Sequence, residues 1–350
     1  METSKEQILK ALEEVIFFPE GDNIVNLGMV QDLKLEGKEV SFNVVFPKIN
    51  DPSVDIVIKS CEKTIHEKIS NELNVHAKAV SQKDAGGGPL AGIKNIIAVA
   101  SGKGGVGKST VAVNLAIALS KTGAKVGLLD ADIYGPSIPT MLDLEDARPD
   151  AIEKDGKTKV LPVEKYGIKV LSIGFFVKPE QALIWRGPMA SKALEQLFND
   201  AEWGELDYMV LDLPPGTGDI HLTMAQDYPI SGAVIVSTPQ KVAMADVRKA
   251  VTMFQQEKIY IPVLGLIENM SYFSPAELPD NRYYIFGKSY SEQFAKKLNI
   301  PFLGQIPMVE SIATSGDQGK PVALKDDSTD AEAFKELANN IIKGLKLLKS

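Results

Sequence analysis

The chain has 350 residues, of which 44% are hydrophobic and 24% charged, and its formal net charge is −8. This length predicts two domains with a large buried core, and an acidic balance without a long basic run argues against a nucleic-acid-binding surface. No apolar stretch approaches membrane-spanning length, and the polar segment 1–10 does not resemble a signal peptide. We therefore expect a cytoplasmic protein with no stable membrane association.

Residues 1–80 show the pattern of a small α+β domain. Ser4 and Gln7 form a capping-box pattern before a helix, and the runs 29–35 and 40–46 are typical of two strands joined by a turn. Asp51-Pro52 is expected to open a second helix. The buried stripe of that helix is expected to comprise Val54, Ile58, Cys61, Ile65, Ile69 and Leu73.

Cys61 is the single cysteine of the sequence, which excludes an internal disulfide and a metal cluster held by several cysteines of one chain. Because Cys61 lies on an apolar stripe, we interpret it as a core residue. His66 and His76 have no partners at metal-ligand spacing. The N-terminal domain thus shows no chemistry of its own.

Residues 81–94 are rich in glycine and polar residues, and we interpret them as a flexible linker. Over residues 95–350, buried strand-like runs alternate with helical patterns. This alternation predicts an α/β domain with a mostly parallel sheet that is covered by helices on both faces.

The strongest motif is the segment 101–110, Ser-Gly-Lys-Gly-Gly-Val-Gly-Lys-Ser-Thr. It contains the P-loop pattern Gly-x-x-x-x-Gly-Lys-Ser/Thr between a strand-like run and a helical pattern, the context that the pattern requires. Such a loop wraps a polyphosphate with backbone N–H groups, helped by the positive end of the following helix. The residues predicted to bind nucleotide are Gly102, Gly104, Gly105, Val106, Gly107, Lys108, Ser109 and Thr110.

Three side chains of this loop have more specific predicted roles. Lys108 is expected to reach the β- and γ-phosphates, and the Ser109 hydroxyl is expected to ligate Mg²⁺. The general pattern does not need Lys103, and we assign it to phosphate rather than to a solvated loop charge. Lys103 and Lys108 are therefore candidate catalytic residues.

Two later strand-like runs end in carboxylates, the first at Asp130 and Asp132 and the second at Asp212. Ligands bind at the carboxyl edge of parallel sheets, so these aspartates are expected beside the phosphates. We assign Asp212 and Asp130 to Mg²⁺, directly or through water, and Asp132 to the attacking water. His221 is interpreted as starting a helix rather than as a catalytic base.

Asn269 follows a further strand-like run, and its side-chain amide offers a donor and an acceptor to an adenine edge. The last predicted element is an amphipathic helix begun by a capping box of Thr329 and Glu332. We interpret it as a docked end helix rather than as a membrane-lying tail, despite its lysines.

These motifs resemble those of a known family. The segment 101–110 resembles the deviant Walker A of the MinD/ParA ATPases, and five further motifs are similar to those of the Mrp/ApbC family. The N-terminal domain resembles the PaaD-type iron-sulfur assembly domain that often precedes this ATPase. The five motifs are Asp130–Pro139, Trp185–Met189, Asp212–Asp219, Asn269–Tyr272 and Ile285–Gly287.

The resemblance implies an ATP-binding, weakly hydrolysing homodimer that carries a 4Fe-4S cluster and passes it to apo-proteins. It also implies that Lys103 reaches across the dimer to the partner's nucleotide, that Asp132 lies in the first switch, that Asp212 is the Walker-B acid and that Asn269 reads adenine. The cofactors expected are ATP and Mg²⁺. The partners expected are a second copy, apo iron-sulfur proteins and assembly factors.

The sequence departs from this family at the cluster site. The family usually places a Cys-x-x-Cys pair between the last two motifs, where two protomers together hold one cluster. Here the segment 271–284 contains no thiol, and the usual cysteine near the start of the second helix of the assembly domain is also absent. No iron-sulfur ligand is therefore identified.

Two functions follow as hypotheses. The first is an ATPase of iron-sulfur cluster assembly and transfer, which the Asp-Ile-Tyr-Gly-Pro and Asn-Met-Ser segments favour. The alternative is a MinD/ParA-like positioning or accessory switch without a metal cluster, which the missing thiols favour. A kinase-like transfer is the least favoured, because the sequence contains no recognisable acceptor pocket.

Overall fold

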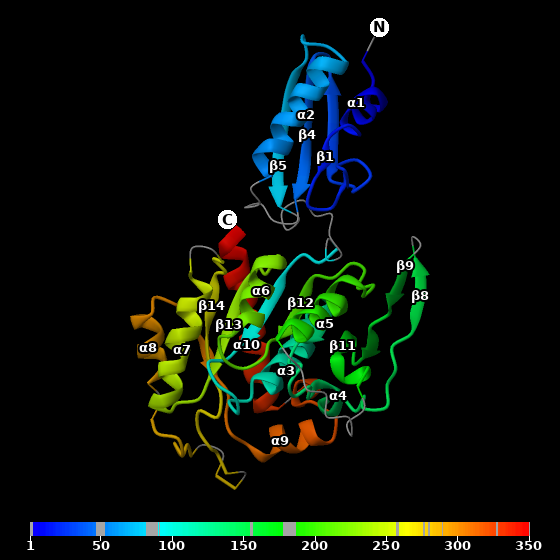
Figure 1. Ribbon diagram of the computed structural model, residues 1–350. Helices are drawn as coiled ribbons and strands as arrows, with labels where there is room; N and C mark the ends of the chain where they lie inside the picture. The colour runs from blue at the N-terminus through cyan, green and yellow to red at the C-terminus, as the bar shows by residue number, and fades with distance from the viewer. Residues whose placement is uncertain are drawn as a thin grey trace. The chain divides into compact units, whose positions relative to one another are not determined.

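A computed structural model describes residues 3–46, 53–81, 90, 92–154, 157–177, 187–256, 259–275, 277–278, 281–288, 290–326 and 328–349. The chain divides into two compact units, 1–88 and 89–350, which we call the N-terminal and C-terminal units (Figure 1). The expected helix start at Asp51-Pro52, most of the expected linker and the first two residues of the Trp185–Met189 motif lie outside the described residues.

The N-terminal unit contains a three-stranded sheet, β3-β4-β5, packed against two helices, and a separate short pair of strands, β1 and β2. Its β3 and β4 are antiparallel and joined by a tight turn, as predicted, whereas β4 and β5 are parallel and joined through α2. The Ser4–Gln7 capping box is confirmed. The elements are α1 Lys5–Leu12, β1 Ile16–Phe17, β2 Asp22–Asn23, β3 Val30–Glu36, β4 Glu39–Phe46, α2 Val54–Lys68 and β5 Asn74–Ser81.

The C-terminal unit is built on an eight-stranded sheet in the order β10-β11-β7-β12-β6-β13-β14-β15. All neighbouring pairs are parallel except β10 with β11. Its strands are β6 Ile96–Ala100, β7 Val126–Asp130, β8 Ala151–Lys154, β9 Lys157–Val160, β10 Val163–Lys165, β11 Ile168–Ser172, β12 Tyr208–Asp212, β13 Gly232–Ser237, β14 Val263–Glu268 and β15 Phe302–Gln305, of which β8 and β9 form a separate hairpin.

Helices connect and flank these strands (Figure 1). They are α3 Lys108–Ser120, α4 Ile138–Met141, η1 Ile173–Phe175, α5 Gly187–Asn199, α6 Asp219–Asp227, α7 Lys241–Phe254, α8 Ser291–Lys297, α9 Glu310–Asp317, η2 Val322–Leu324 and α10 Thr329–Lys349. The predicted α/β fold with a mostly parallel sheet is confirmed.

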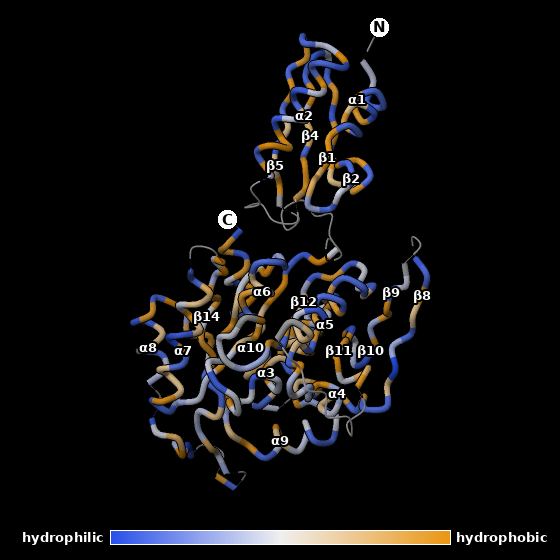
Figure 2. The backbone as a smooth tube through the Cα atoms, in the orientation of Figure 1, coloured by the Kyte–Doolittle hydropathy of each residue, from blue (hydrophilic) through white to orange (hydrophobic). Residues whose placement is uncertain are grey.

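The burial of the central strands explains their continuous apolar sequences. Successive residues of a strand point to opposite faces, yet every residue of β6, β7 and β13 is buried, so both faces of the sheet are covered. Their continuous apolar runs follow from this double coverage. In Figure 2 the hydrophobic colour accordingly follows β12 and β14, whereas much of the β8 strand is hydrophilic.

Helix α10 is a docked helix, as predicted, and packs against α3, β14 and β15. Phe334, Leu337, Ile341 and Leu345 are buried, but Leu348 is exposed. No described helix is long and apolar enough to cross a membrane.

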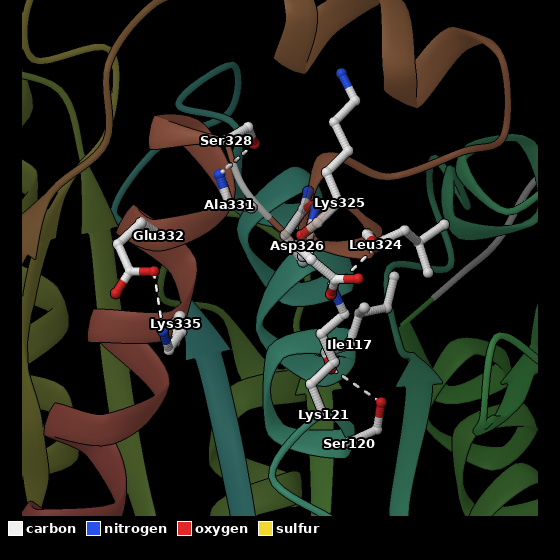
Figure 3. Close-up of polar contacts among 12 residues, drawn as sticks. Ile117, Ser120, Lys121, Leu324, Lys325, Asp326, Ser328, Ala331, Glu332 and Lys335 are labelled. Carbon is white, nitrogen blue, oxygen red and sulfur yellow. Dashed lines mark hydrogen bonds and ion pairs between the residues drawn. The ribbon is translucent and has the colours of Figure 1, made fainter.

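The start of α10 differs from the prediction by one residue. The hydroxyl of Ser328, not of Thr329, accepts the hydrogen bond from the Ala331 N–H at 3.1 Å, and Glu332 pairs with Lys335 (Figure 3). Two adjacent hydroxyl residues offer the same local pattern, and only the position where the backbone turns into the helix decides between them.

The same region is fastened to the end of α3. The ammonium group of Lys121 donates hydrogen bonds to the carbonyls of Leu324 and Lys325 at 2.9 and 3.0 Å and to the Asp326 carboxylate at 2.8 Å (Figure 3). Deeper in the unit, the Ala323 N–H donates to the Asn114 amide oxygen at 2.9 Å. The segment before α10 is thereby tied to the helix that follows the P-loop.

Ser328→Ala should lower the free energy of unfolding by about 1 kcal/mol, because a helix N-cap side chain contributes about that much. Thr329→Ala is the matched control and should change it by much less. Urea denaturation of the two variants measures both values. Equal destabilisation by the two substitutions would contradict the assignment of Ser328 as the cap.

Candidate nucleotide site

The candidate site lies at the carboxyl edge of the sheet. Strands β6, β7 and β12 run parallel, and Asp212 is in register with both Asp130 and Val99. The Ala131 N–H also donates to the Asp212 carbonyl at 2.9 Å. The two carboxylates and the P-loop therefore converge at one edge, as their positions at strand ends indicated.

Two glycines of the loop occupy places that no other residue fits. A Cβ atom at Gly102 would lie 2.5 Å from the backbone of Asp246 in α7. At Gly107, the N-cap of α3, it would lie 2.2 Å from the Asn269 side-chain amide, and the φ angle there is +80°. Glycine at these two positions lets the loop pack directly against α7 and against Asn269, which follows β14.

Lys108 is the central charge of the site. Its side chain is only 6% exposed, and its ammonium lies 2.5 Å from Asp212 Oδ1 and 3.5 Å from Asp132 Oδ2. The Ser109 hydroxyl is 3.4 Å from the same ammonium. A buried lysine in this position is neutralised by carboxylates of two different strand ends.

Asp212 is fully buried and uses only one of its carboxylate oxygens in this ion pair. Oδ2 has no hydrogen-bond partner among the described residues. Burial raises the pKa of Asp212, whereas the charge of Lys108 and hydrogen bonds from Lys108 and Ser109 oppose that rise. A buried carboxylate oxygen with no partner, next to a serine hydroxyl, has the chemistry of a Mg²⁺ site.

Asp130 is held differently. It accepts hydrogen bonds from the Ser172 hydroxyl at 3.0 Å, from the Asp132 N–H at 3.1 Å and from the Ile138 N–H at 3.4 Å. Burial and the nearby charge of Asp212 raise its pKa to about 8. Both oxygens of Asp130 are thus engaged in shaping the turn after β7, and its assignment to Mg²⁺ stays a prediction.

Asp132 lies between the buried charges and solvent, with 13% of its side chain exposed. Burial raises its pKa, and Lys108 together with the backbone N–H groups of Tyr134 and Gly135 opposes the rise. It is therefore the carboxylate of this site that a bound water reaches most easily. Its predicted part in positioning the attacking water fits this place.

The Asn269 side chain lies against the P-loop. Its Nδ2 donates to the Val106 carbonyl at 2.8 Å, and its backbone N–H donates to the Ser237 carbonyl at 2.7 Å. Only 6% of the residue is exposed. The amide nitrogen thus donates to the loop, and the predicted contact of this amide with an adenine edge stays a prediction.

The remaining predicted loop residues have few side-chain contacts. Lys103 is half-buried, and its carbonyl accepts the Ser101 hydroxyl at 2.9 Å. Gly104 and Gly105 are exposed, and Thr110 lies in the first turn of α3, where its carbonyl accepts the Asn114 amide at 2.9 Å. The exposed glycines and Lys103 form the open side of the loop.

Sequence reasoning missed two residues of this edge. Ser172 ends β11, the strand beside β7, and only the strand pairing reveals that it faces Asp130. Glu268 ends β14 and is fully buried. His221 lies in the first turn of α6, as predicted, and burial lowers its pKa, so it stays neutral.

Cys61 is fully buried in the core of the N-terminal unit. Burial raises the pKa of its thiol to about 12, so the thiol stays protonated at neutral pH. Thiolates, not thiols, ligate iron, and the predicted core role of Cys61 is consistent with this environment.

The two units match two different protein families. Residues 92–342 match the ParA family, described as NUBPL iron-transfer P-loop NTPase, and residues 5–77 match the family described as iron-sulfur cluster assembly protein.

Individual relatives agree with the family matches. An iron-sulfur cluster carrier protein of Synechocystis is 45% identical over 327 residues, which cover 91% of each chain. Its namesake in Escherichia coli is 46% identical over 280 residues, covering 80% of this chain and 73% of the relative.

Solved structures extend the comparison. A nucleotide-binding protein of Archaeoglobus fulgidus, solved with ADP, is 41% identical and matches with a TM-score of 0.59 over 68% of this chain and 92% of its own. MinD of Pyrococcus furiosus matches with a TM-score of 0.50 at 21% identity over 71% of this chain and 99% of its own, which shows the fold alone. The chain therefore belongs to the ParA-type family of NUBPL iron-transfer P-loop NTPases, and its residues 5–77 are similar to the iron-sulfur cluster assembly protein family.

Proposed function

We propose that this chain binds and slowly hydrolyses ATP, as a nucleotide-dependent homodimer, to assist the transfer of iron-sulfur clusters to apo-proteins. The observation that carries the proposal is the buried Lys108–Asp212 ion pair beneath the glycine loop, in a chain whose two units both match iron-sulfur families. Relatives named as cluster carriers support this function over a MinD-like positioning switch.

The ion pair supplies the chemistry of nucleotide binding. A polyphosphate entering the loop offers Lys108 a new anionic partner, and the backbone N–H groups of the loop and the start of α3 add donors. Lys108 then pairs with phosphate in place of the Asp212 carboxylate. Asp212 is left with a free negative charge, for which a cation is the natural partner.

Mg²⁺ fits the groups that remain. Ser109 provides a hydroxyl, and Asp212 provides Oδ2, which has no hydrogen-bond partner among the described residues. Mg²⁺ accepts both kinds of oxygen. When bound, Mg²⁺ neutralises phosphate charge. Asp130 contributes by holding the turn after β7, where it accepts hydrogen bonds from the N–H groups of Asp132 and Ile138.

We assign hydrolysis to Asp132 and dimerisation to Lys103. We assign Asp132 to orienting a water. Lys103, which is half-buried beside the exposed Gly104 and Gly105, is assigned to the nucleotide of a second copy. The turns after Asp132 and Asp212 are the segments expected to move when the γ-phosphate leaves.

The cluster itself is cargo. A 4Fe-4S cluster is usually held by four thiolates, whereas this sequence contains one cysteine, which is buried and protonated. The chain's own residues therefore do not fit the cluster. We assign the thiolates to another protein, either a donor or an apo-protein client, and ATP-dependent assistance to this chain.

Lys108→Ala should weaken ATP binding on the order of a hundredfold, because it removes a charge-assisted contact to phosphate. Lys103→Ala should change binding little and lower turnover roughly tenfold or more, because its predicted contact forms across the dimer during hydrolysis. Titration calorimetry and phosphate release measure these effects. Lys343→Ala, on the exposed side of α10, is the control. Equal loss of binding in both loop variants would refute this division of roles.

The same variants test the function in cells. A strain lacking this protein should lose activity of 4Fe-4S enzymes under iron limitation, and wild type but not Lys108→Ala should restore it. Normal iron-sulfur enzyme activities in the deletion strain would refute the assignment to cluster transfer.

Anaerobic reconstitution with iron and sulfide should leave no stable cluster on either wild type or Cys61→Ser, because the Cys61 thiol is buried and protonated. Iron and sulfide counts per protomer after gel filtration are the measurement. A stable cluster on the wild type that disappears in Cys61→Ser would make Cys61 a ligand and contradict its core role.

A further inference from the structure

Glu268 is a buried carboxylate that joins three separate segments. Its Oε1 accepts hydrogen bonds from the Ser271 hydroxyl at 2.5 Å and from the Gln305 amide at 2.9 Å, and its Oε2 accepts one from the Ser291 hydroxyl. These donors lie 3, 37 and 23 residues along the chain. The side chain has no solvent exposure.

Two of the donors lie at the ends of the connection between β14 and α8. Ser271 follows the end of β14, and Ser291 begins α8 (Figure 1). We call the described residues of this connection, 271–275, 277–278, 281–288 and 290–291, the excursion. Gln305 ends the neighbouring strand β15. The Glu268 carboxylate therefore fixes both ends of the excursion and the edge strand at one buried point.

The next residue along the chain, Asn269, contacts the P-loop. Its amide donates to the Val106 carbonyl at 2.8 Å, and the following residue, Met270, has a φ angle of +53°. A left-handed backbone at a residue with a side chain is unfavourable and needs support from its surroundings. The Ser271–Glu268 hydrogen bond spans this turn, and the backbone N–H groups of Asn269 and Ser271 anchor it to the carbonyls of Ser237 and Ile306.

We propose that Glu268 is a positioning residue for the nucleotide. It helps to hold the turn 268–271 so that the Asn269 amide stays on the P-loop carbonyl of Val106. Glu268 acts through Asn269 and does not touch the nucleotide. This inference rests on the proposed ATP-dependent function.

The test compares two substitutions of Glu268. Glu268→Met keeps the volume and removes both acceptors, so it should raise KM for ATP roughly five- to tenfold with kcat nearly unchanged, because it misplaces one binding group. Glu268→Gln keeps one acceptor oxygen for Ser271 and Gln305, and its NH2 group can donate to the Ser291 hydroxyl oxygen, so it should restore most of the affinity. Glu277→Met, at an exposed glutamate of the same excursion, is the matched control and should behave as wild type.

A double-mutant cycle separates positioning from a general structural role. If Glu268 acts through Asn269, then Glu268→Met should add little to the KM effect of Asn269→Ala. If Glu268→Met does not fold, Ser271→Ala removes one donor with little change of shape and should raise KM in the same direction by a smaller factor.

Failure of the positioning role and failure of the proposed function give different results in these experiments. Wild type that neither binds nor hydrolyses ATP would refute the function itself. Active wild type with an unchanged KM in Glu268→Met, or with additive effects of the Glu268 and Asn269 substitutions, would overturn the positioning role alone.

Discussion

The candidate site depends on one buried ion pair, Lys108 with Asp212. Placing a lysine and an aspartate at 6% and 0% side-chain exposure is costly unless each neutralises the other. The pair therefore holds the start of α3 against the end of β12, and Asp132 adds a second carboxylate to the same ammonium. Because the aspartates lie where phosphate and metal are expected, we propose that a bound nucleotide replaces Asp212 as the partner of Lys108.

The loop that carries Lys108 is also packed closely against its neighbours. Gly102 and Gly107 leave room for Asp246 and Asn269, which brings α7 and the end of β14 against the loop. In our proposal, Glu268 holds the turn that carries Asn269. Direct contacts thus connect the loop to the excursion, the segment that lacks the cysteine pair expected from the family resemblance.

Much of this edge could be predicted from the sequence, because local patterns encode it. The P-loop glycines, the apolar runs and the aspartates at their ends indicate a parallel sheet with carboxylates beside a phosphate loop, and strand pairing places Asp130 and Asp212 in register. Ser172 and Glu268 could not be found in this way. Ser172 meets Asp130 only through the pairing of β11 with β7, and two partners of Glu268 lie 23 and 37 residues away. The cap of α10 was missed by one residue, because Ser328 and Thr329 offer the same hydroxyl.

The central claim is that Lys108 exchanges Asp212 for phosphate when ATP binds, and it is tested most directly by the ATP affinity of Asp212→Asn with and without Mg²⁺. Without Mg²⁺, the variant should bind ATP more tightly than wild type, because no carboxylate competes for Lys108 or repels the phosphates. With Mg²⁺, it should lose the gain in affinity that the metal gives the wild type. Weaker binding by Asp212→Asn in the absence of Mg²⁺ would contradict the exchange.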